Sequence, residues 1–363
     1  MKAIVHAGMD KTGSSSIQRT LHTLNMPNHL YAPWKTAHHD TLLPLLFRED
    51  PENFPLFKVE GRTRKELVAE RDLWRDKLKE AISTSDKSEI IFSAEMLSSG
   101  GNEEIVQGLA EFLKETCSET KTVMYVRSPV SFMQSSFQQK IKTGRISELN
   151  VDRLWPNYRK TISVLDKHFG QENTHIFKFD PASFPDQNVV KDFGQRLGIR
   201  IPDKKIVRVN DGLSLEGVAL AFLQRKFGSG VHTGFAGARL RNKQFTDALN
   251  EIGEGRVVFS EDLTRPVLEK HKDMLDWLEK RVGEPMTETP KEGDVVISEE
   301  RDLIRLARRN ARPLNELLEK VLSEQDDLSS KSISAEAVST VMSKRGNEIA
   351  TLVEKLELLK ALT

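Results

Sequence analysis

Four short, mainly apolar runs, each followed by a polar turn, dominate the hydrophobic pattern of the first half of the chain. They cover Ala3–Ala7, Glu89–Ser93, Thr122–Val126 and Thr174–Phe179. Short apolar runs between turn signals are typical of strands buried on both faces of a parallel sheet. Segments with helical spacing lie between them, so the pattern predicts an α/β fold in which helices flank a parallel sheet.

Helical periodicity marks the longer segments. Ile17, Leu21 and Leu24 share one helix face after Ser14, and apolar residues recur at helical spacing amid dense charge from Thr63 to Ser83. The pattern also predicts helices over residues 151–168 and over Val190–Leu197. These assignments give the strand–helix alternation that the fold class requires.

The chain divides into regions of different composition. Prolines and aromatic residues scattered through residues 25–60 predict a loop-rich insertion, which either shapes a binding pocket or has its aromatic residues packed under a long loop. We expect one α/β domain over residues 1–297, mainly helical from residue 200, and a charged helical extension over residues 298–363. The stripe Ile349, Leu352, Leu356 and Leu359 packs either on the main domain or in a homodimer.

The turn after the first strand carries the most informative chemistry. Gly8-Met9-Asp10-Lys11-Thr12-Gly13-Ser14-Ser15-Ser16 joins this strand to a helix. Backbone N–H groups at a helix start have no intrahelical partner, and together with the helix dipole they favour an anion. The usual nucleoside-triphosphate loop has its lysine after the second glycine, whereas Lys11 comes two residues before Gly13. The ordinary ATP loop is therefore absent.

A second strand-to-helix junction follows Thr122–Val126. Arg127 ends this strand, Ser128-Pro129 is typical of a helix start, and Ser135 lies about two helical turns further on. A guanidinium can donate two hydrogen bonds to a phosphate, and a serine hydroxyl can donate a third.

Both junctions resemble signatures of the sulfotransferases, the enzymes that use 3'-phosphoadenosine 5'-phosphosulfate. The stretch from His6 to Gln18 is similar to the H-x-G-x-x-K-T-G-[ST]-[ST]-S-[IL]-Q start of bacterial members, and Arg127 with Ser135 to their R-x-P-x(5)-S signature. The resemblance implies a P-loop fold of the nucleotide-kinase-like kind. It also implies that the 5'-phosphosulfate binds to Lys11, Thr12, Gly13, Ser14, Ser15 and Ser16, and that Arg127 and Ser135 bind the 3'-phosphate.

An acceptor hydroxyl needs a base, and Glu95 follows the strand Glu89–Ser93 at the sheet edge where ligands bind in open α/β folds. The segment around Glu95 resembles the S-x-E-x-L-S segment of bacterial sulfotransferases. Some sulfotransferases use a glutamate and others a histidine, so His38 and His39 are the competing candidates. We expect no chemical role for His6, which falls inside the first strand.

Composition excludes several classes of function. The chain has 54 Lys and Arg against 54 Asp and Glu, so no net field favours nucleic acid. One cysteine excludes an internal disulfide and suits a reducing compartment, and no motif predicts a metal site. No apolar run reaches membrane-spanning length and no signal peptide precedes the first strand, so we expect a cytoplasmic protein without a membrane span.

The resemblance thus implies a sulfotransferase that releases adenosine 3',5'-bisphosphate, and we expect it to need no metal. The family resemblance implies a small-molecule or glycan acceptor, with a carbohydrate or glycolipid hydroxyl as the expected group. Two alternatives stay open. One is a nucleotide or small-molecule kinase, which the order of Lys11 and Gly13 disfavours. The other is a non-catalytic nucleotide-binding protein whose C-terminal helices serve assembly.

Overall fold

The computed structural model describes the chain except residues 100, 210–211, 234–236, 288–294 and 326–333. By their contacts the residues form two units. The first comprises Met1–Ser128, Asn157–Asn210 and Lys272–Thr287, and the second comprises Pro129–Pro156, Asp211–His271 and Glu288–Thr363. The boundary that the sequence predicts near residue 298 stays a prediction.

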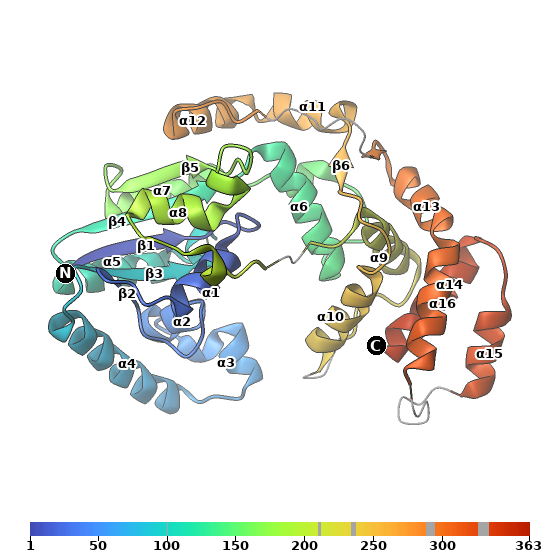
Figure 1. Ribbon diagram of the computed structural model, residues 1–363, viewed down its shortest axis with the longest axis horizontal. Coiled ribbons are helices and arrows are strands. Elements are labelled where there is room, and N and C mark those ends of the chain that lie inside the picture. Colours follow the sequence, from blue (N-terminus) through green and yellow to red (C-terminus); the bar gives the residue numbers. More distant parts are fainter. Residues whose placement is uncertain (100, 210–211, 234–236, 288–294, 326–333) are drawn as a thin grey trace. The chain divides into compact units, whose positions relative to one another are not determined.

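The first unit contains a five-stranded, wholly parallel sheet in the order β2-β3-β1-β4-β5 (Figure 1). The strands are β1 (Lys2–Ala7), β2 (His29–Tyr31), β3 (Glu89–Ala94), β4 (Thr120–Val126) and β5 (Thr174–Lys178). Four of them coincide with the predicted runs, so the α/β class is confirmed. Strand β2 was not predicted because its three residues lie in the proline-rich segment and form no distinct apolar run.

Helices flank this sheet. They are α1 (Ser14–Thr23), α2 (Leu42–Phe47), α3 (Pro55–Val59), α4 (Arg64–Thr84), α5 (Glu103–Thr116), α7 (Tyr158–Phe169), α8 (Val189–Leu197) and α12 (Lys272–Val282). Helices α1 and α8 contact each other, and their apolar side chains share a buried cluster with Ile4, Ile91 and Val123 of the sheet. A capping box formed by Thr63 and Glu66 starts α4.

The helix predicted over residues 151–168 is shorter than expected. Val151–Leu154 forms only a 3-10 turn, η3, and α7 begins at Tyr158. Pro156 separates the two because proline lacks a backbone N–H and keeps the preceding residue out of the helical region. The side chain of Asn157 instead accepts a hydrogen bond from the N–H of Lys160 and caps α7.

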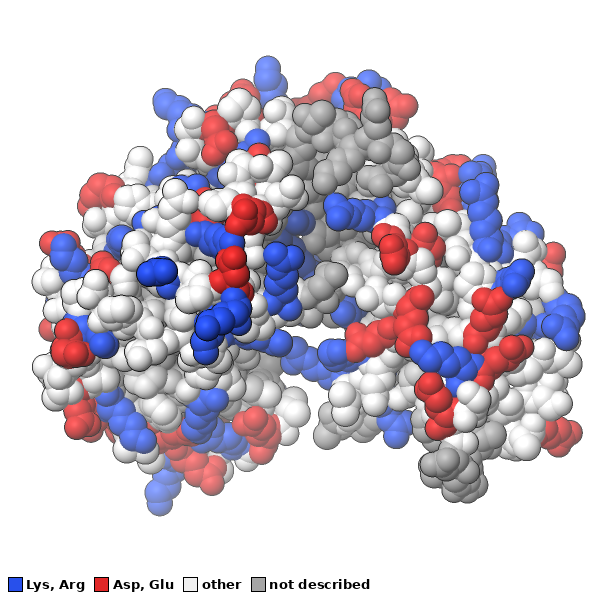
Figure 2. Space-filling model, in the orientation of Figure 1, with Lys and Arg blue, Asp and Glu red and all other residues white. Residues whose placement is uncertain are grey.

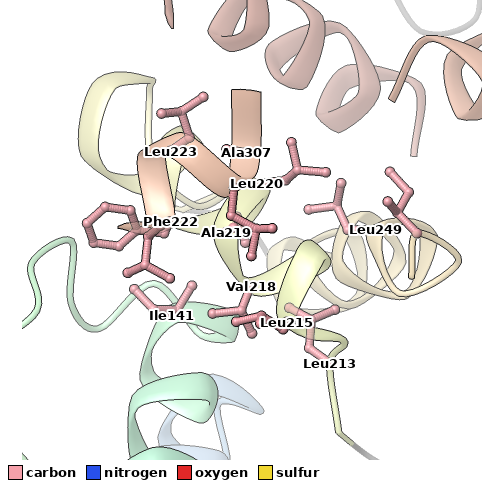
Figure 3. Close-up of a cluster of buried hydrophobic side chains, with 14 of the residues drawn as sticks. Ile141, Leu213, Leu215, Val218, Ala219, Leu220, Phe222, Leu223, Leu249 and Ala307 are labelled. Atoms are coloured by element: carbon pink, nitrogen blue, oxygen red, sulfur yellow. The ribbon is translucent and has the colours of Figure 1, made fainter. Parts of the chain in front are cut away.

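The second unit is mainly helical. It contains α6 (Pro129–Lys142), α9 (Leu215–Phe227), α10 (Ala238–Leu249), α11 (Glu261–Lys270), α13 (Glu300–Arg309), α14 (Ala311–Ser323), α15 (Ala335–Ser343) and α16 (Ile349–Leu362). Two short parallel strands, β6 (Val258–Phe259) and β7 (Val296–Ile297), pair within it. Most of helix α9 is apolar and buried, and Figure 3 shows several of its side chains within the core cluster.

The C-terminal helices pack onto this core. Helices α13 and α16 both contact α9, and Leu352, Leu356 and Leu359 of α16 are fully buried. The predicted apolar stripe therefore packs within the chain, the first of the two alternatives. Association into a homodimer stays a prediction.

The surface carries both signs of charge. Figure 2 shows Lys and Arg side chains alongside Asp and Glu on each part of the chain in that view, in line with a net charge of zero. Within the described residues, no helix combines the length and the apolar character needed to span a bilayer.

Candidate functional site

Strand order places the predicted site residues of the first unit at one sheet edge. Strand β1 lies between β3 and β4, and Ala7 pairs with Ala94 at the carboxyl ends of β1 and β3. Glu95 follows β3 and Arg127 follows β4, so they come from the strands on either side of the one that leads into the loop Gly8–Gly13. After β1 the chain forms β2 and β3 on one side of it and then β4 on the other side. The carboxyl ends of these strands are therefore at a topological switch point, where ligands bind in such sheets.

The loop between β1 and α1 is tightly turned and internally bonded. Lys11 and Gly13 both have left-handed backbone conformations, with φ of 63° and 75°. This conformation is uncommon for a residue with a side chain, and such residues cluster at functional sites. The Thr12 hydroxyl donates to the Met9 carbonyl at 2.7 Å and lies 3.3 Å from the Ser14 hydroxyl. The turn is thus held by its own side chains.

These bonds determine which predicted donors can face an anion. Thr12 and Ser14 are buried and their hydroxyls are engaged within the loop, while the Ser16 hydroxyl accepts a hydrogen bond from the N–H of Val209. The Thr12 N–H donates to Met9 and the Ser16 N–H to Gly13. Ser14 and Ser15 begin the first turn of α1, where backbone N–H groups have no intrahelical acceptor. Their N–H groups and the Lys11 ammonium are the donors that suit an anion.

Glu95 lies against this loop. A β-carbon at Gly8 would stand 2.4 Å from Ser14 Oγ and 3.3 Å from Glu95 Cγ, so only glycine fits between the loop and the glutamate. The Gly8 N–H donates to Ala94 at 3.1 Å, and the Ser98 hydroxyl donates to the Gly8 carbonyl at 2.8 Å. The half-buried Glu95 is therefore tied to the loop through residues on both sides of it.

Arg127 shares a neighbour with the loop. Its guanidinium lies 4.9 Å from the ring centroid of Phe179, and a β-carbon at Gly13 would lie 4.0 Å from the same ring. The Phe179 N–H donates to Val126 at 2.7 Å, and the Tyr158 hydroxyl donates to the Arg127 carbonyl at 2.6 Å. The structure thus brings Arg127 to the side of the loop opposite Glu95.

Ser135 belongs to α6, in the second unit, and is half-buried. Its pairing with Arg127 on one phosphate stays a prediction. Helix α6 begins at Pro129, as the Ser128-Pro129 pattern predicts.

The two histidine candidates differ sharply. His39 is fully buried: its Nε2 donates to the Ala32 carbonyl at 3.1 Å, and its Nδ1 accepts from the Ser93 N–H at 2.9 Å. Both ring nitrogens therefore have backbone partners, and burial lowers the pKa of His39 to about 3. His38 is exposed, with Nδ1 3.5 Å from Asp40 Oδ2. Of the two, only His38 presents its ring to solvent.

His6 is a core residue, as expected. It is fully buried, with Nδ1 2.7 Å from the Ser93 hydroxyl, and its ring packs edge-on against Phe193. Burial lowers the pKa of His6 to about 4. Gln18, which the same sequence motif contains, donates to the Ser93 carbonyl at 3.4 Å, so both residues brace the end of β3.

Three site neighbours were not predicted from the sequence: Asp40, Phe179 and Val189. Asp40 Oδ1 accepts a hydrogen bond from the Met96 N–H at 2.8 Å, and a β-carbon at Gly13 would lie 2.5 Å from Val189 Cγ1. The sequence could have indicated Asp40 as a site residue, because it directly follows the two candidate histidines, His38 and His39. Among the residues outside the gaps given above, no three His, Cys, Asp or Glu side chains gather in an arrangement suited to a metal.

Comparison with known proteins adds two partial matches. No protein-family model and no curated protein sequence matches the chain. A sulfotransferase from Alicyclobacillus acidocaldarius is 19% identical, with 57% of this chain and 86% of that chain covered and a TM-score of 0.34. A sulfotransferase domain from the curacin biosynthetic pathway is 13% identical, with 66% and 81% covered and a TM-score of 0.31.

The fully buried His6 and His39 predict a loss of stability in acid. Each has a folded-state pKa below its unfolded value, so the stability is present above about pH 6.5 and is lost as pH falls towards 4. Between pH 7 and pH 5 each histidine should cost about 2 kcal/mol of unfolding free energy, because the unfolded chain takes up a proton that the folded chain excludes. Urea unfolding followed by tryptophan fluorescence measures this loss.

The matched comparison uses His39→Gln, His6→Asn and the exposed His175→Gln. The first two variants should lose about 2 kcal/mol less than the wild type between the two pH values, and His175→Gln should follow the wild type. An equal acid sensitivity in all three variants would contradict the buried, neutral state of His6 and His39.

Proposed function

We propose that the protein is a sulfotransferase that moves the sulfuryl group of 3'-phosphoadenosine 5'-phosphosulfate to an acceptor hydroxyl. The observation that carries the proposal is the left-handed Lys11–Gly13 turn at the carboxyl end of β1, with Glu95 following β3 on one side and Arg127 following β4 on the other. In the ATP-binding loop the lysine follows the second glycine, and Lys11 precedes it.

The residues of the loop fit the 5' end of such a nucleotide. Gly8 and Gly13 leave no room for a β-carbon because side chains of this chain pack against them, which holds the turn at the start of α1. The first N–H groups of α1 add the positive end of the helix dipole. When bound, the nucleotide supplies an activated sulfuryl group. Lys11 with the N–H groups of Ser14 and Ser15 would stabilise the negative charge that develops on the leaving phosphate oxygens.

Arg127 is the proposed partner of the 3'-phosphate, together with Ser135 as the sequence motif predicts. The guanidinium suits this role because it donates two parallel hydrogen bonds to phosphate oxygens. Its position over the Phe179 ring restricts its motion, which lowers the entropy lost on binding. Recognition of a second phosphate is what would distinguish this nucleotide from an ordinary mononucleotide.

Glu95 is the proposed general base. As the acceptor oxygen forms a bond to sulfur and the bond from sulfur to the leaving phosphate oxygen breaks, the hydroxyl proton would pass to the Glu95 carboxylate. The closeness of its side chain to Gly8 of the loop supports this role, because a base must lie near the transferring group. His39 offers no ring nitrogen for the task in this structure, so His38 is the remaining competitor.

The acceptor is proposed to be a hydroxyl of a carbohydrate or glycolipid, on the strength of the resemblance to bacterial sulfotransferases. Transfer of radiolabelled sulfate to a panel of glycan and lipid acceptors tests this part. Magnesium-dependent ATP binding would support the kinase alternative instead. Binding of adenosine 3',5'-bisphosphate without transfer to any acceptor would support the non-catalytic alternative.

Removal of the Lys11 ammonium should slow sulfuryl transfer at least about 100-fold, because one transition-state donor of this kind contributes about 3 kcal/mol. Lys11→Asn is the better variant than Lys11→Ala, since asparagine tolerates the left-handed backbone that residue 11 adopts. The measurement is turnover with labelled donor. The exposed Lys114→Ala on α5 should retain wild-type turnover, and a near-normal rate in both Lys11 variants would remove Lys11 from the mechanism.

Loss of the Arg127 guanidinium should act on nucleotide binding. Arg127→Ala should bind adenosine 3',5'-bisphosphate about 10- to 100-fold more weakly, because hydrogen bonds to charged groups contribute about 1.5–3 kcal/mol. Affinity for adenosine 5'-monophosphate, which lacks the 3'-phosphate, should change little. Calorimetry on Arg127→Ala and on the exposed Arg312→Ala provides the comparison, and an equal loss for both nucleotides would contradict 3'-phosphate recognition.

Neutralising the proposed base should separate binding from turnover. Glu95→Gln should bind adenosine 3',5'-bisphosphate as the wild type does and lose most of its transfer activity, because the amide cannot accept the hydroxyl proton. The exposed Glu80→Gln on α4 is the matched control. If His38→Ala abolishes turnover with binding intact while Glu95→Gln stays active, the base is His38.

A further inference from the structure

The turn that contains His38, His39 and Asp40 is anchored directly to the end of β3. The His39 N–H donates to the Ser93 carbonyl at 3.0 Å, and the Ser93 N–H donates back to His39 Nδ1 at 2.9 Å. Beyond the end of β2, the Nδ1 atom of the His39 ring thus accepts a hydrogen bond from the backbone of β3, as a carbonyl of a neighbouring strand would. Its packing against Tyr31 and Phe92, at centroid distances of 4.9 and 5.9 Å, holds it in the core.

These contacts of His39 place the carboxylate of the next residue, Asp40, beside the turn that begins at Glu95. Asp40 Oδ1 accepts a hydrogen bond from the Met96 N–H at 2.8 Å. Burial raises the pKa of Asp40, while the backbone N–H groups of Met96 and Glu95 act in the opposite direction by stabilising the ionised carboxylate. Residues Glu95–Ser98 form a single 3-10 turn, η2, which is too short to be stable without contacts to other parts of the chain. The carboxylate supplies the acceptor that the start of this turn lacks.

The other side of this turn is hydrogen-bonded to Gly8 of the loop Gly8–Gly13. Ala94 accepts from the Gly8 N–H, and the Ser98 hydroxyl donates to the Gly8 carbonyl. Ser98 is itself held, because its carbonyl accepts from the Thr161 hydroxyl of α7 at 2.8 Å. Asp40 therefore completes a set of bonds that fixes the Glu95 backbone between the sheet, α7 and Gly8.

We propose that Asp40 is a positioning residue that holds Glu95 in place for proton transfer. The inference rests on the proposed function of Glu95 as the base. Asp40 acts through the backbone of residues 95 and 96, so it needs an oxygen acceptor there. Its second carboxylate oxygen faces His38, and the Asp10 carboxylate is the other nearby charge that acts on it.

Two variants separate positioning from other effects. Asp40→Ala should lower kcat about 10- to 100-fold, the cost of misplacing a catalytic group by about an ångström, while KM for the donor stays within about twofold. Asp40→Asn keeps an oxygen that can accept from Met96, so it should restore most of kcat. Hydrogen exchange at the Met96 amide should speed up in Asp40→Ala and return towards the wild-type rate in Asp40→Asn.

Thr63→Ala is the matched control, because it also removes a capping oxygen in the first unit, at the start of α4. It should lower thermal stability without changing kcat. The proposal is overturned if Asp40→Ala turns over normally, if Asp40→Asn is as slow as Asp40→Ala, or if Thr63→Ala slows transfer equally. If the wild type transfers no sulfate at all, the proposed function fails, and Met96 exchange still decides whether Asp40 holds this turn.

Discussion

Parallel pairing of β1 with both β3 and β4 is the constraint on which the candidate site depends. The register Ala7 to Ala94 brings the ends of β1 and β3 level, and β4 runs beside β1 in the same direction. Every residue that follows one of these strands then lies at one edge. The loop Gly8–Gly13, Glu95 and Arg127 come together for this reason, although about 80 residues or more separate the loop from the other two in sequence.

The loop itself meets a second constraint, close approach of the backbone. Gly8 faces Ser14 and Glu95, and Gly13 faces Val189 and Phe179, with no space for a β-carbon at either glycine. The same contacts that exclude side chains there bring the residues that follow β3 and β5, and Val189 of α8, against the turn. This close packing holds the turn, in which the N–H groups of Ser14 and Ser15 and the Lys11 ammonium are the donors that suit an anion.

Much of this arrangement could be predicted from local patterns. The apolar runs predicted the strands β1, β3, β4 and β5, and the strand-to-helix junctions indicated Lys11 and Arg127 as candidate site residues. What could not be predicted depends on contacts distant in sequence. Strand β2 forms because its three residues pair with β3. His39 is held in the core because both of its ring nitrogens form hydrogen bonds, one with the Ala32 carbonyl and one with the Ser93 N–H. Adjacent histidines look alike in sequence, and only tertiary burial makes His38 and His39 different.

The central claim is that the Lys11–Gly13 turn and Arg127 recognise a nucleotide with phosphates at both the 5' and 3' positions. Calorimetric titration of the wild-type protein with adenosine 3',5'-bisphosphate, adenosine 5'-monophosphate and magnesium-ATP tests it most directly. The account predicts that the bisphosphate binds without magnesium and more tightly than the monophosphate. Tight binding of magnesium-ATP together with no measurable binding of the bisphosphate would contradict it.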